Sequence, residues 1–172
     1  MTSFTQFKNQ FIARLSTRFP VLGKRFTNAF VPWETEGVPW TPASKPLSKC
    51  KVALVTTAGV HHRSQQPFDM RDPQGDPTFR EIEASRPITN LMITHDYYNH
   101  ADADKDINVV FPIERLWDFE DEGLLGKAAE THYSFMGHIQ GPHIQTLIYQ
   151  NAPEVARRLK NSAVDLIILT PG

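Results

Sequence analysis

Seven histidines give this sequence its clearest potential for acid–base chemistry, and they fall into three groups along the chain. Histidine is the side chain whose unperturbed pKa lies nearest neutrality, so histidines that gather where strands end predict a site. Hydrogen-bonded imidazoles in polar strand-end loops are the alternative interpretation for part of the set. The groups are His61 with His62, His95 with His100, and His132 with His138 and His143.

The segment 95–104, with the sequence HDYYNHADAD, bears on metal binding because imidazole and carboxylate groups are suitable ligands. His95 and His100 are five residues apart, so they do not share a helical face as an i, i+4 pair would. The alternating acids also lack the Gly and the terminal Glu of a calcium loop. A hydrogen-bonded loop that lines a pocket is therefore favoured over a metal centre.

Small and hydroxyl-bearing residues follow the first predicted strand, residues 51–57. Thr56, Thr57 and Gly59 offer hydroxyls and backbone N–H groups that could bind a carboxylate or another anion. The segment matches no phosphate-binding glycine fingerprint, and the chain contains no serine nucleophile elbow. Cys50 precedes the strand, so we interpret it as a packing residue rather than a nucleophile.

The elements that must position these groups alternate between strands and helices. Short strands are predicted at 79–82, 91–94, 109–111, 132–137 and 164–169. Helices are predicted from Pro112 and over 139–159, and Pro153 predicts a break in the second of them. Such alternation predicts an α/β fold, a single three-layer domain with a mostly parallel sheet.

An N-terminal arm precedes this domain. Apolar residues at three- and four-residue spacing predict an amphipathic helix that docks on the domain or on a second subunit, with a membrane-surface helix as the alternative. Four prolines and two tryptophans in residues 31–48 predict an extended linker. The predicted organisation is a helical arm (1–30), a linker (31–49) and an α/β domain (50–172). The apolar positions are Phe4, Phe7, Phe11, Ile12, Leu15 and Phe19.

Bulk properties limit the class of protein. Residues 1–33 hold five basic and no acidic side chains, whereas the remainder holds 13 basic and 19 acidic ones, a formal charge of −6. The arm is thus expected to contact an acidic surface, and a nucleic-acid partner is not expected. No apolar run could span a bilayer, and a single cysteine fits the reducing cytoplasm, where we expect the protein to reside, as a homo-oligomer.

The end of the sequence carries one further expectation. The apolar strand at 164–169 is followed only by Thr170, Pro171 and Gly172, at the edge where an open α/β sheet places its ligands. A buried strand of this kind needs layers on both faces. We therefore expect a protein that is incomplete at its C-terminus.

Several blocks together resemble the selenoprotein B subunit of glycine, sarcosine, betaine and D-proline reductases, most of all the short D-proline-reductase type. The resemblance begins at about Pro32 and covers most of the chain. It rests on residues 38–42 (VPWTP), 51–61 (KVALVTTAGVH), 94–96 (THD), 104–116 with its Val-Phe-Pro, and 132–137 (HYSFMG).

The resemblance implies a dithiol-dependent oxidoreductase in which a selenocysteine or cysteine, placed after the strand at 164–169, attacks the substrate carbon that bears nitrogen. It also implies an amino-acid or amine-like substrate and a partner reductase subunit. This chain holds no such motif, so selenocysteine is expected only in a full-length form and the chain itself is expected to be inactive.

The residues that would serve this chemistry come from the strand-end segments. His61, His95 and Asp96 would shape, protonate or orient the substrate. The expected substrate-binding residues are Thr56, Thr57, Gly59, His100, Tyr133, Ser134 and Thr170. Two alternatives remain open: a metal or small-molecule binding domain lined by histidine and aspartate, and an assembly subunit that functions through its aromatic arm.

Overall fold

The computed structural model describes residues 4–19, 37, 41–85 and 87–172. The chain divides into two compact units, residues 1–44 with 96–99, and residues 45–95 with 100–172.

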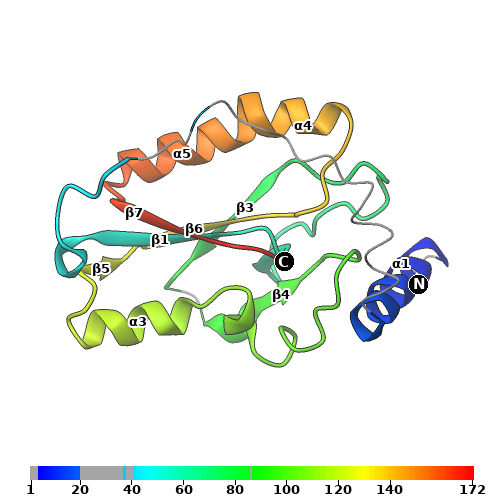
Figure 1. Cartoon of the computed structure of the whole chain (residues 1–172), viewed down its shortest axis with the longest axis horizontal. Helices are drawn as coiled ribbons and strands as arrows, with labels where there is room; N and C mark the ends of the chain where they lie inside the picture. Colours follow the sequence, from blue (N-terminus) through cyan, green and yellow to red (C-terminus); the bar gives the residue numbers. More distant parts are fainter. Residues whose placement is uncertain (1–3, 20–36, 38–40, 86) are drawn as a thin grey trace. The chain divides into compact units, whose positions relative to one another are not determined.

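Figure 1 shows the elements in chain order. The strands are β1 (Lys51–Thr56), β2 (Val60–His62), β3 (Phe79–Glu83), β4 (Leu91–Ile93), β5 (Lys127–Ala128), β6 (Thr131–Phe135) and β7 (Leu166–Thr170). The helices are α1 (Phe4–Arg18), α3 (Ile113–Asp121), α4 (Pro142–Thr146) and α5 (Ala152–Asn161), with the π-helical turn η4 (Leu147–Asn151) and the 3-10 turns η1 (Leu47–Lys49), η2 (Ile88–Asn90) and η3 (Ile107–Val109).

Strand β1 is the centre of the main sheet in the larger unit. It pairs in parallel with β7 along one edge and with β5 and then β6 along the other. Strand β3 lies beyond β6 and is antiparallel to it. The predicted α/β class with a mostly parallel sheet is therefore confirmed.

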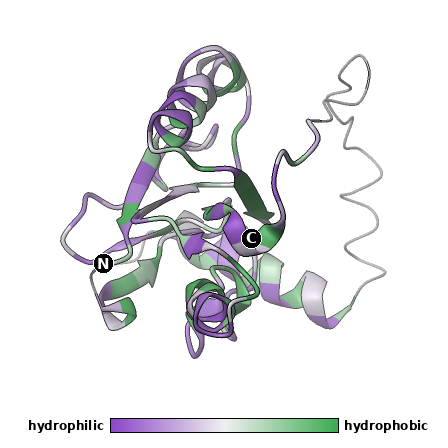
Figure 2. Cartoon of the chain, turned by 90° about the vertical axis from the view of Figure 1, so that its left-hand side faces the viewer, coloured by the Kyte–Doolittle hydropathy of each residue, from purple (hydrophilic) through white to green (hydrophobic). Residues whose placement is uncertain are grey.

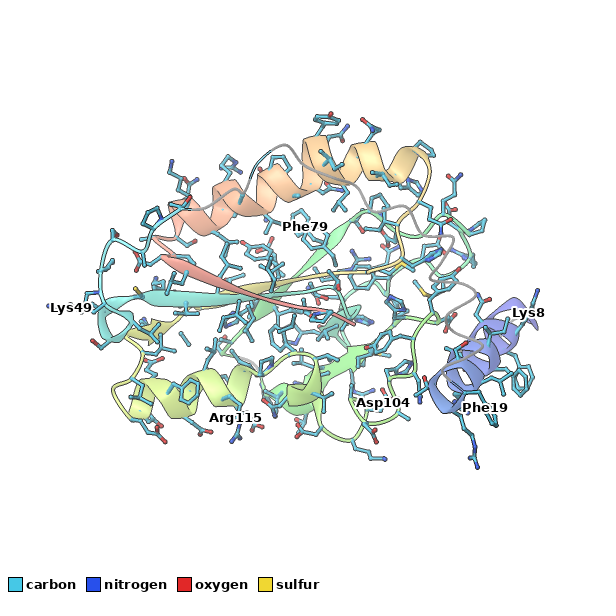
Figure 3. All side chains as sticks on the ribbon, viewed as in Figure 1. Lys8, Phe19, Lys49, Phe79, Asp104 and Arg115 are labelled. Atoms are coloured by element: carbon cyan, nitrogen blue, oxygen red, sulfur yellow. The ribbon has the colours of Figure 1, made fainter. Side chains whose placement is uncertain are left out.

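Alternate residues of β1 face two helical layers, because successive side chains of a strand point to opposite faces. Ala53 and Val55 pack with Val155 and Leu159 of α5. Phe79 joins this cluster between the sheet and the helix (Figure 3). Seen end-on, the sheet lies between α4 and α5 on one side and α3 on the other (Figure 2). The larger unit thus has the three layers that the sequence predicts.

The face towards α3 contains a buried histidine that completes the sheet. His132 is fully buried, and its ring packs edge-on against Phe111, with centroids 5.7 Å apart. Its Nδ1 accepts a hydrogen bond of 2.8 Å from the backbone N–H of Leu54. This N–H falls between the stretch of β1 that pairs with β5 and the stretch that pairs with β6. The imidazole therefore satisfies a backbone donor that neither strand reaches.

The predicted break near Pro153 is wrong. Residues 142–161 run without interruption through α4, η4 and α5. Proline has no backbone N–H, so the carbonyl four residues before it loses its α-helical hydrogen bond. A π turn, in which the hydrogen bonds join residues five apart, is one way to accommodate this loss. The wider turn at Leu147–Asn151 lies immediately before Pro153, so the helix changes its pitch there and continues.

Three other predictions need correction or fall outside the described residues. Val60–His62, predicted as a loop, is strand β2 and pairs antiparallel with β4. The predicted strand at 109–111 is the end of η3 and the residues after it. Residues 31–36 and 38–40 of the predicted linker lie outside the described part of the chain. None of the described helices is long and apolar enough to cross a membrane.

Candidate functional site

Gly59 joins the carboxyl ends of β6 and β4. Its N–H donates to the carbonyl of Phe135, and its own carbonyl accepts from the N–H of Thr94, both at 2.9 Å. Strand β4 therefore delivers Thr94 and His95 to the edge of the main sheet at which parallel strands end. This is the edge where open α/β sheets bind their ligands.

His61 is fully buried, and both of its ring nitrogens have partners. Nδ1 lies 2.9 Å from the carbonyl oxygen of His62, and Nε2 lies 2.8 Å from the hydroxyl oxygen of Thr94. Because a carbonyl only accepts, Nδ1 carries the proton and Nε2 accepts from the Thr94 hydroxyl. Burial lowers the pKa of His61, and the charges of Arg80 and Arg63 lower it further. His61 is thus a neutral group that orients Thr94.

Thr94 was not among the predicted site residues, although it lies directly before His95 at the end of a predicted strand. Its hydroxyl hydrogen points to His61, so its oxygen lone pairs are directed elsewhere. Thr94 can therefore accept a hydrogen bond from a ligand, and its orientation is set in advance.

His95 is 5% exposed and lies beside Gly59, since a Cβ built on that glycine would lie 3.1 Å from its Cβ. Burial lowers the pKa of His95 to about 4, with smaller contributions from His138 and His100. The imidazole is neutral at pH 7 as a result. This differs from the expected proton donor, because a neutral histidine must first bind a proton before it can donate one.

Three predicted substrate-binding hydroxyls lie side by side on the face towards α3. Thr56 is in register with Ser134 of β6 and with Thr170 of β7. The hydroxyls of Thr56 and Thr170 both donate to the carbonyl oxygen of Val110, at 3.0 and 2.7 Å. Ser134 is fully buried and lies 3.4 Å from the carbonyl of Phe135. This row attaches the segment before α3 to the sheet, so its protons are already used within the fold.

The other predicted substrate-binding residues are separated by the fold. Thr57 is exposed at the carboxyl end of β1. Tyr133 lies in the core beneath α5, on the opposite face from the hydroxyl row, so its position does not support contact with a ligand at this edge. His100 pairs through Nδ1 with a carboxylate oxygen of Asp104, at 2.8 Å.

Asp96 belongs to the smaller unit, with helix α1. Its Oδ1 accepts a hydrogen bond of 2.8 Å from the side-chain amide of Gln10, and the residue is 6% exposed. The sequence analysis did not anticipate this partner, because the two residues are 86 positions apart.

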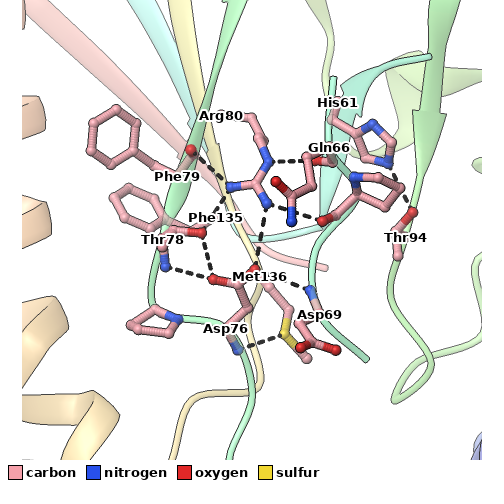
Figure 4. Close-up of polar contacts among 12 residues, drawn as sticks. His61, Gln66, Asp69, Asp76, Thr78, Phe79, Arg80, Thr94, Phe135 and Met136 are labelled. Carbon is pink, nitrogen blue, oxygen red and sulfur yellow. Dashed lines mark hydrogen bonds and ion pairs between the residues drawn. The ribbon is translucent and has the colours of Figure 1, made fainter. Parts of the chain in front are cut away.

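A half-buried arginine, Arg80, also missed from the sequence, supports the region around His61 (Figure 4). The side chains of Arg80 and Asp76 are 13% and 10% exposed and form an ion pair of 3.4 Å. The guanidinium stacks on Phe68, 4.2 Å from the ring centroid, and Phe68 meets the His61 ring edge-on. Arg80 also donates to the carbonyls of residues 66, 67 and 79 and to the Thr78 hydroxyl. All five of its N–H donors are engaged, which makes it a structural group rather than an anion-binding one.

Among the residues that the structure describes, no three His, Cys, Asp or Glu side chains are grouped so that they could hold a metal ion. The aspartates of the 69–76 loop act as hydrogen-bond acceptors for nearby backbone N–H groups instead. The alternative of a metal-binding domain is therefore not supported by any group of such ligands among the described residues.

Comparison with known families adds to this geometry. The family model of glycine/sarcosine/betaine reductase selenoprotein B matches residues 19–172. The chain belongs to this family. The resemblance predicted from the sequence is confirmed, and the sheet edge around Gly59 is the candidate site of a selenoprotein B family member.

Curated members of the family differ in length from this chain. D-proline reductase subunit gamma of Acetoanaerobium sticklandii is 37% identical over 133 residues, 77% of this chain and 53% of that protein. Glycine reductase complex component B subunit gamma of Carboxydothermus hydrogenoformans is 28% identical over 163 residues, 87% of this chain and 34% of that protein. Betaine reductase complex component B subunit beta of Peptoclostridium acidaminophilum is 31% identical over 138 residues, 73% of this chain and 29% of that protein. The chain spans between about a third and about half of these relatives, and no solved structure matches it.

Gly59 allows a direct test of the site geometry in this selenoprotein B chain. Its φ is +71°, and a Cβ would lie 2.5 Å from the carbonyl oxygen of Thr94. We expect Gly59→Ala to lower the free energy of unfolding by about 1–3 kcal/mol and to displace His95. Urea denaturation and the imidazole NMR signals of His95 would measure both effects. Gly123→Ala is the matched control, because Gly123 also has positive φ but nothing within 4 Å of its Cβ position. Equal effects of the two substitutions would contradict the prediction.

Proposed function

We propose that the protein is a cytoplasmic subunit of a selenol- or thiol-dependent reductase that cleaves a C–N bond of an amino acid or amine-like substrate. The family match over residues 19–172 carries the proposal. The relatives are named as subunits of D-proline, glycine and betaine reductases, whose substrates all carry an amine or ammonium nitrogen. A partner reductase subunit is part of the same proposal.

The redox group itself is not Cys50. This cysteine is 1% exposed, and its Sγ donates to the carbonyls of Lys45 and Pro46. It precedes β1, at the opposite end of the strand from Gly59. A selenol or thiol supplied by another segment or subunit would attack the carbon that bears nitrogen and displace the nitrogen. A second thiol would then attack the selenium or sulfur bound to that carbon, so that the carbon leaves with a proton and a selenenylsulfide or disulfide remains, which an external dithiol reduces.

The contribution of this chain is proton transfer and substrate positioning. His95 is neutral at pH 7, so it can take the proton of an incoming thiol or selenol and leave the nucleophile ionised. The nitrogen that departs from carbon needs a proton, and the imidazolium formed in the first step can donate it. The oxygen of Thr94 can accept a hydrogen bond from a substrate nitrogen that carries hydrogen, as in glycine or D-proline, while His61 holds the hydroxyl in place. Thr57 and Gly59 border the same edge of the sheet.

His95 provides the test of this role. In the assembled reductase, we expect His95→Ala to lower kcat/KM by about 100-fold or more, because general acid–base catalysis contributes factors of this size. The rates at which the wild-type and variant enzymes reduce D-proline, glycine and betaine should be measured from about pH 5 to about pH 9, at equal enzyme concentrations. His143→Ala is the control, since this imidazole pairs with Asp72 and is not part of the site.

Two outcomes would oppose the proposal in different ways. A His95→Ala enzyme with unchanged activity and pH profile would remove His95 from the mechanism. A wild-type complex that consumes none of these substrates, although a dithiol is supplied, would remove the reductase assignment itself.

A further inference from the structure

Residues 57–59, the loop after β1, use their backbone N–H groups within the fold. Those of Thr57, Ala58 and Gly59 donate to internal acceptors at 2.9, 3.2 and 2.9 Å. A loop that recognises a carboxylate or a phosphate needs such groups to point outward. This edge of the sheet therefore does not offer the backbone donors of an anion site. The acceptors are the carbonyls of Thr170 and Phe135 and the hydroxyl oxygen of Thr56.

Thr94 offers an acceptor at the same edge, and its orientation is fixed. Its backbone N–H donates to the carbonyl of Gly59, and its hydroxyl donates to Nε2 of His61 (Figure 4). His61 is fully buried, so water cannot replace Thr94 as its partner. Since the only hydrogen of the hydroxyl is used, the oxygen can only accept a hydrogen bond from a ligand. Among the described residues no donor reaches this oxygen, and Thr94 is only half-buried.

Membership of the family leaves open which groups the substrate nitrogen carries. Relatives of the chain are named as subunits of D-proline, glycine and betaine reductases. The nitrogen of D-proline or glycine carries hydrogen, whereas that of betaine carries three methyl groups and no hydrogen. A hydrogen bond to the oxygen of Thr94 is therefore possible for the first two compounds and impossible for the third.

We propose that Thr94 selects substrates whose nitrogen carries hydrogen and discriminates against quaternary ammonium compounds. The inference rests on the proposed function and names the substrate class of the same site. A methyl group placed against the Thr94 oxygen would exclude water from an acceptor and give it no partner. Sites that hydrogen-bond an N–H of their substrate discriminate strongly against analogues without it for this reason.

The test is the binding of a methylation series to the chain. Glycine, sarcosine, N,N-dimethylglycine and betaine share one carboxylate and, as ammonium ions, carry three, two, one and no hydrogens on nitrogen. Isothermal titration calorimetry would measure the four dissociation constants. We expect the first three constants to agree within about 10-fold and betaine to bind about 10- to 100-fold more weakly than dimethylglycine, because only the last methyl group removes the last N–H.

Substitutions at position 94 identify the acceptor. Thr94→Val keeps the shape of the side chain but removes the oxygen, so it should weaken binding of the three N–H ligands by about 10- to 100-fold and leave betaine unchanged. Thr94→Ser keeps the hydroxyl and should keep the preference. Thr131→Val is the matched control, because Thr131 begins β6 and lies at the opposite end of that strand from the site. The series on the wild-type chain needs no variant, so the test holds even if Thr94→Val does not fold.

Four results would overturn the inference: a betaine dissociation constant equal to that of dimethylglycine, a loss of affinity spread evenly over the three methyl groups, an unchanged series in Thr94→Val, or a chain that binds none of the four compounds. Turnover by the assembled reductase separates this inference from the proposed function. A complex that reduces sarcosine and betaine equally well would overturn the selection and leave the reductase assignment. A complex that reduces neither, while the chain still binds betaine more weakly than dimethylglycine, would overturn the assignment and leave the selection.

Discussion

Replacing Arg80 with Ala is expected to lower the free energy of unfolding by roughly 2–4 kcal/mol, because it removes the partner of the buried Asp76 from a largely buried ion pair. Asp76 would keep its hydrogen bonds from the N–H groups of Asp69 and Thr78 but would lose the only guanidinium that the structure places beside it among the described residues. Three backbone carbonyls, of Gln66, Pro67 and Phe79, would lose a donor in the same step.

Urea denaturation followed by circular dichroism would measure this loss. Arg71→Ala is the matched control: it also removes an arginine–aspartate pair, with Asp69, but these side chains are 89% and 47% exposed. Exposed pairs contribute about 0–1 kcal/mol, so the control should change little. Arg80→Lys should recover only part of the stability, since an ammonium cannot reach five acceptors in one plane. Equal losses at positions 71 and 80 would show that the network is not a structural one.

Arg80→Ala should also affect the candidate site, because Arg80 is connected to His61 through the ring of Phe68. The guanidinium packs on Phe68, and Phe68 packs on the ring of His61. His61 in turn fixes the direction of the Thr94 hydroxyl. Loss of Arg80 therefore loosens a group that we propose contacts the substrate, although the N–H donors of Arg80 are all used within the fold.

The elements that the sequence predicted well are those with a strong hydrophobic pattern. Strand β7 was predicted as a buried strand, but it lies at the edge of the sheet beside β1, and Ile167, Ile168 and Leu169 are 46%, 41% and 75% exposed. Strand β1 is an apolar run buried at the centre of the sheet, and α5 has one apolar face that includes Val155 and Leu159. These patterns arise because such residues must be removed from water whatever the details of the fold. The position of the site at the carboxyl ends of the strands follows from the same parallel topology.

What the sequence could not predict depends on contacts between distant segments. Strand β5 has only two residues, which are too few to show the alternation of apolar and polar residues that predicts a strand. The bond between His132 and the N–H of Leu54 joins residues 78 positions apart, and a histidine on a strand gives no sign of such a role. The protonation state of His95 likewise depends on burial by the whole unit, so the sequence alone suggested a donor where the structure has a neutral ring.

Acid is expected to destabilise the protein strongly over the range from pH 6.5 down to about 4. Burial lowers the pKa of His95 and of His132 from 6.5 to about 4 in the folded chain. Between these values the unfolded chain binds a proton at each residue and the folded chain does not, so the free energy of unfolding decreases as pH falls. Each pKa difference of one unit is worth about 1.4 kcal/mol, so each imidazole accounts for roughly 3 kcal/mol. Two such losses approach the entire stability of a typical domain, about 5–15 kcal/mol.

Urea denaturation at several pH values between about 4.5 and 7.5 would measure this dependence. His132→Asn should decrease the slope below pH 6.5 by up to about 1.4 kcal/mol per pH unit, because an asparagine oxygen can accept from the Leu54 N–H but does not titrate. The cavity left by the smaller side chain lowers stability equally at every pH, so it shifts the curve without changing its slope. A wild-type chain whose stability is constant from pH 7 to 4.5 would mean that the buried imidazoles are protonated in the folded state, and the neutral His95 on which the proposed mechanism relies would then be wrong.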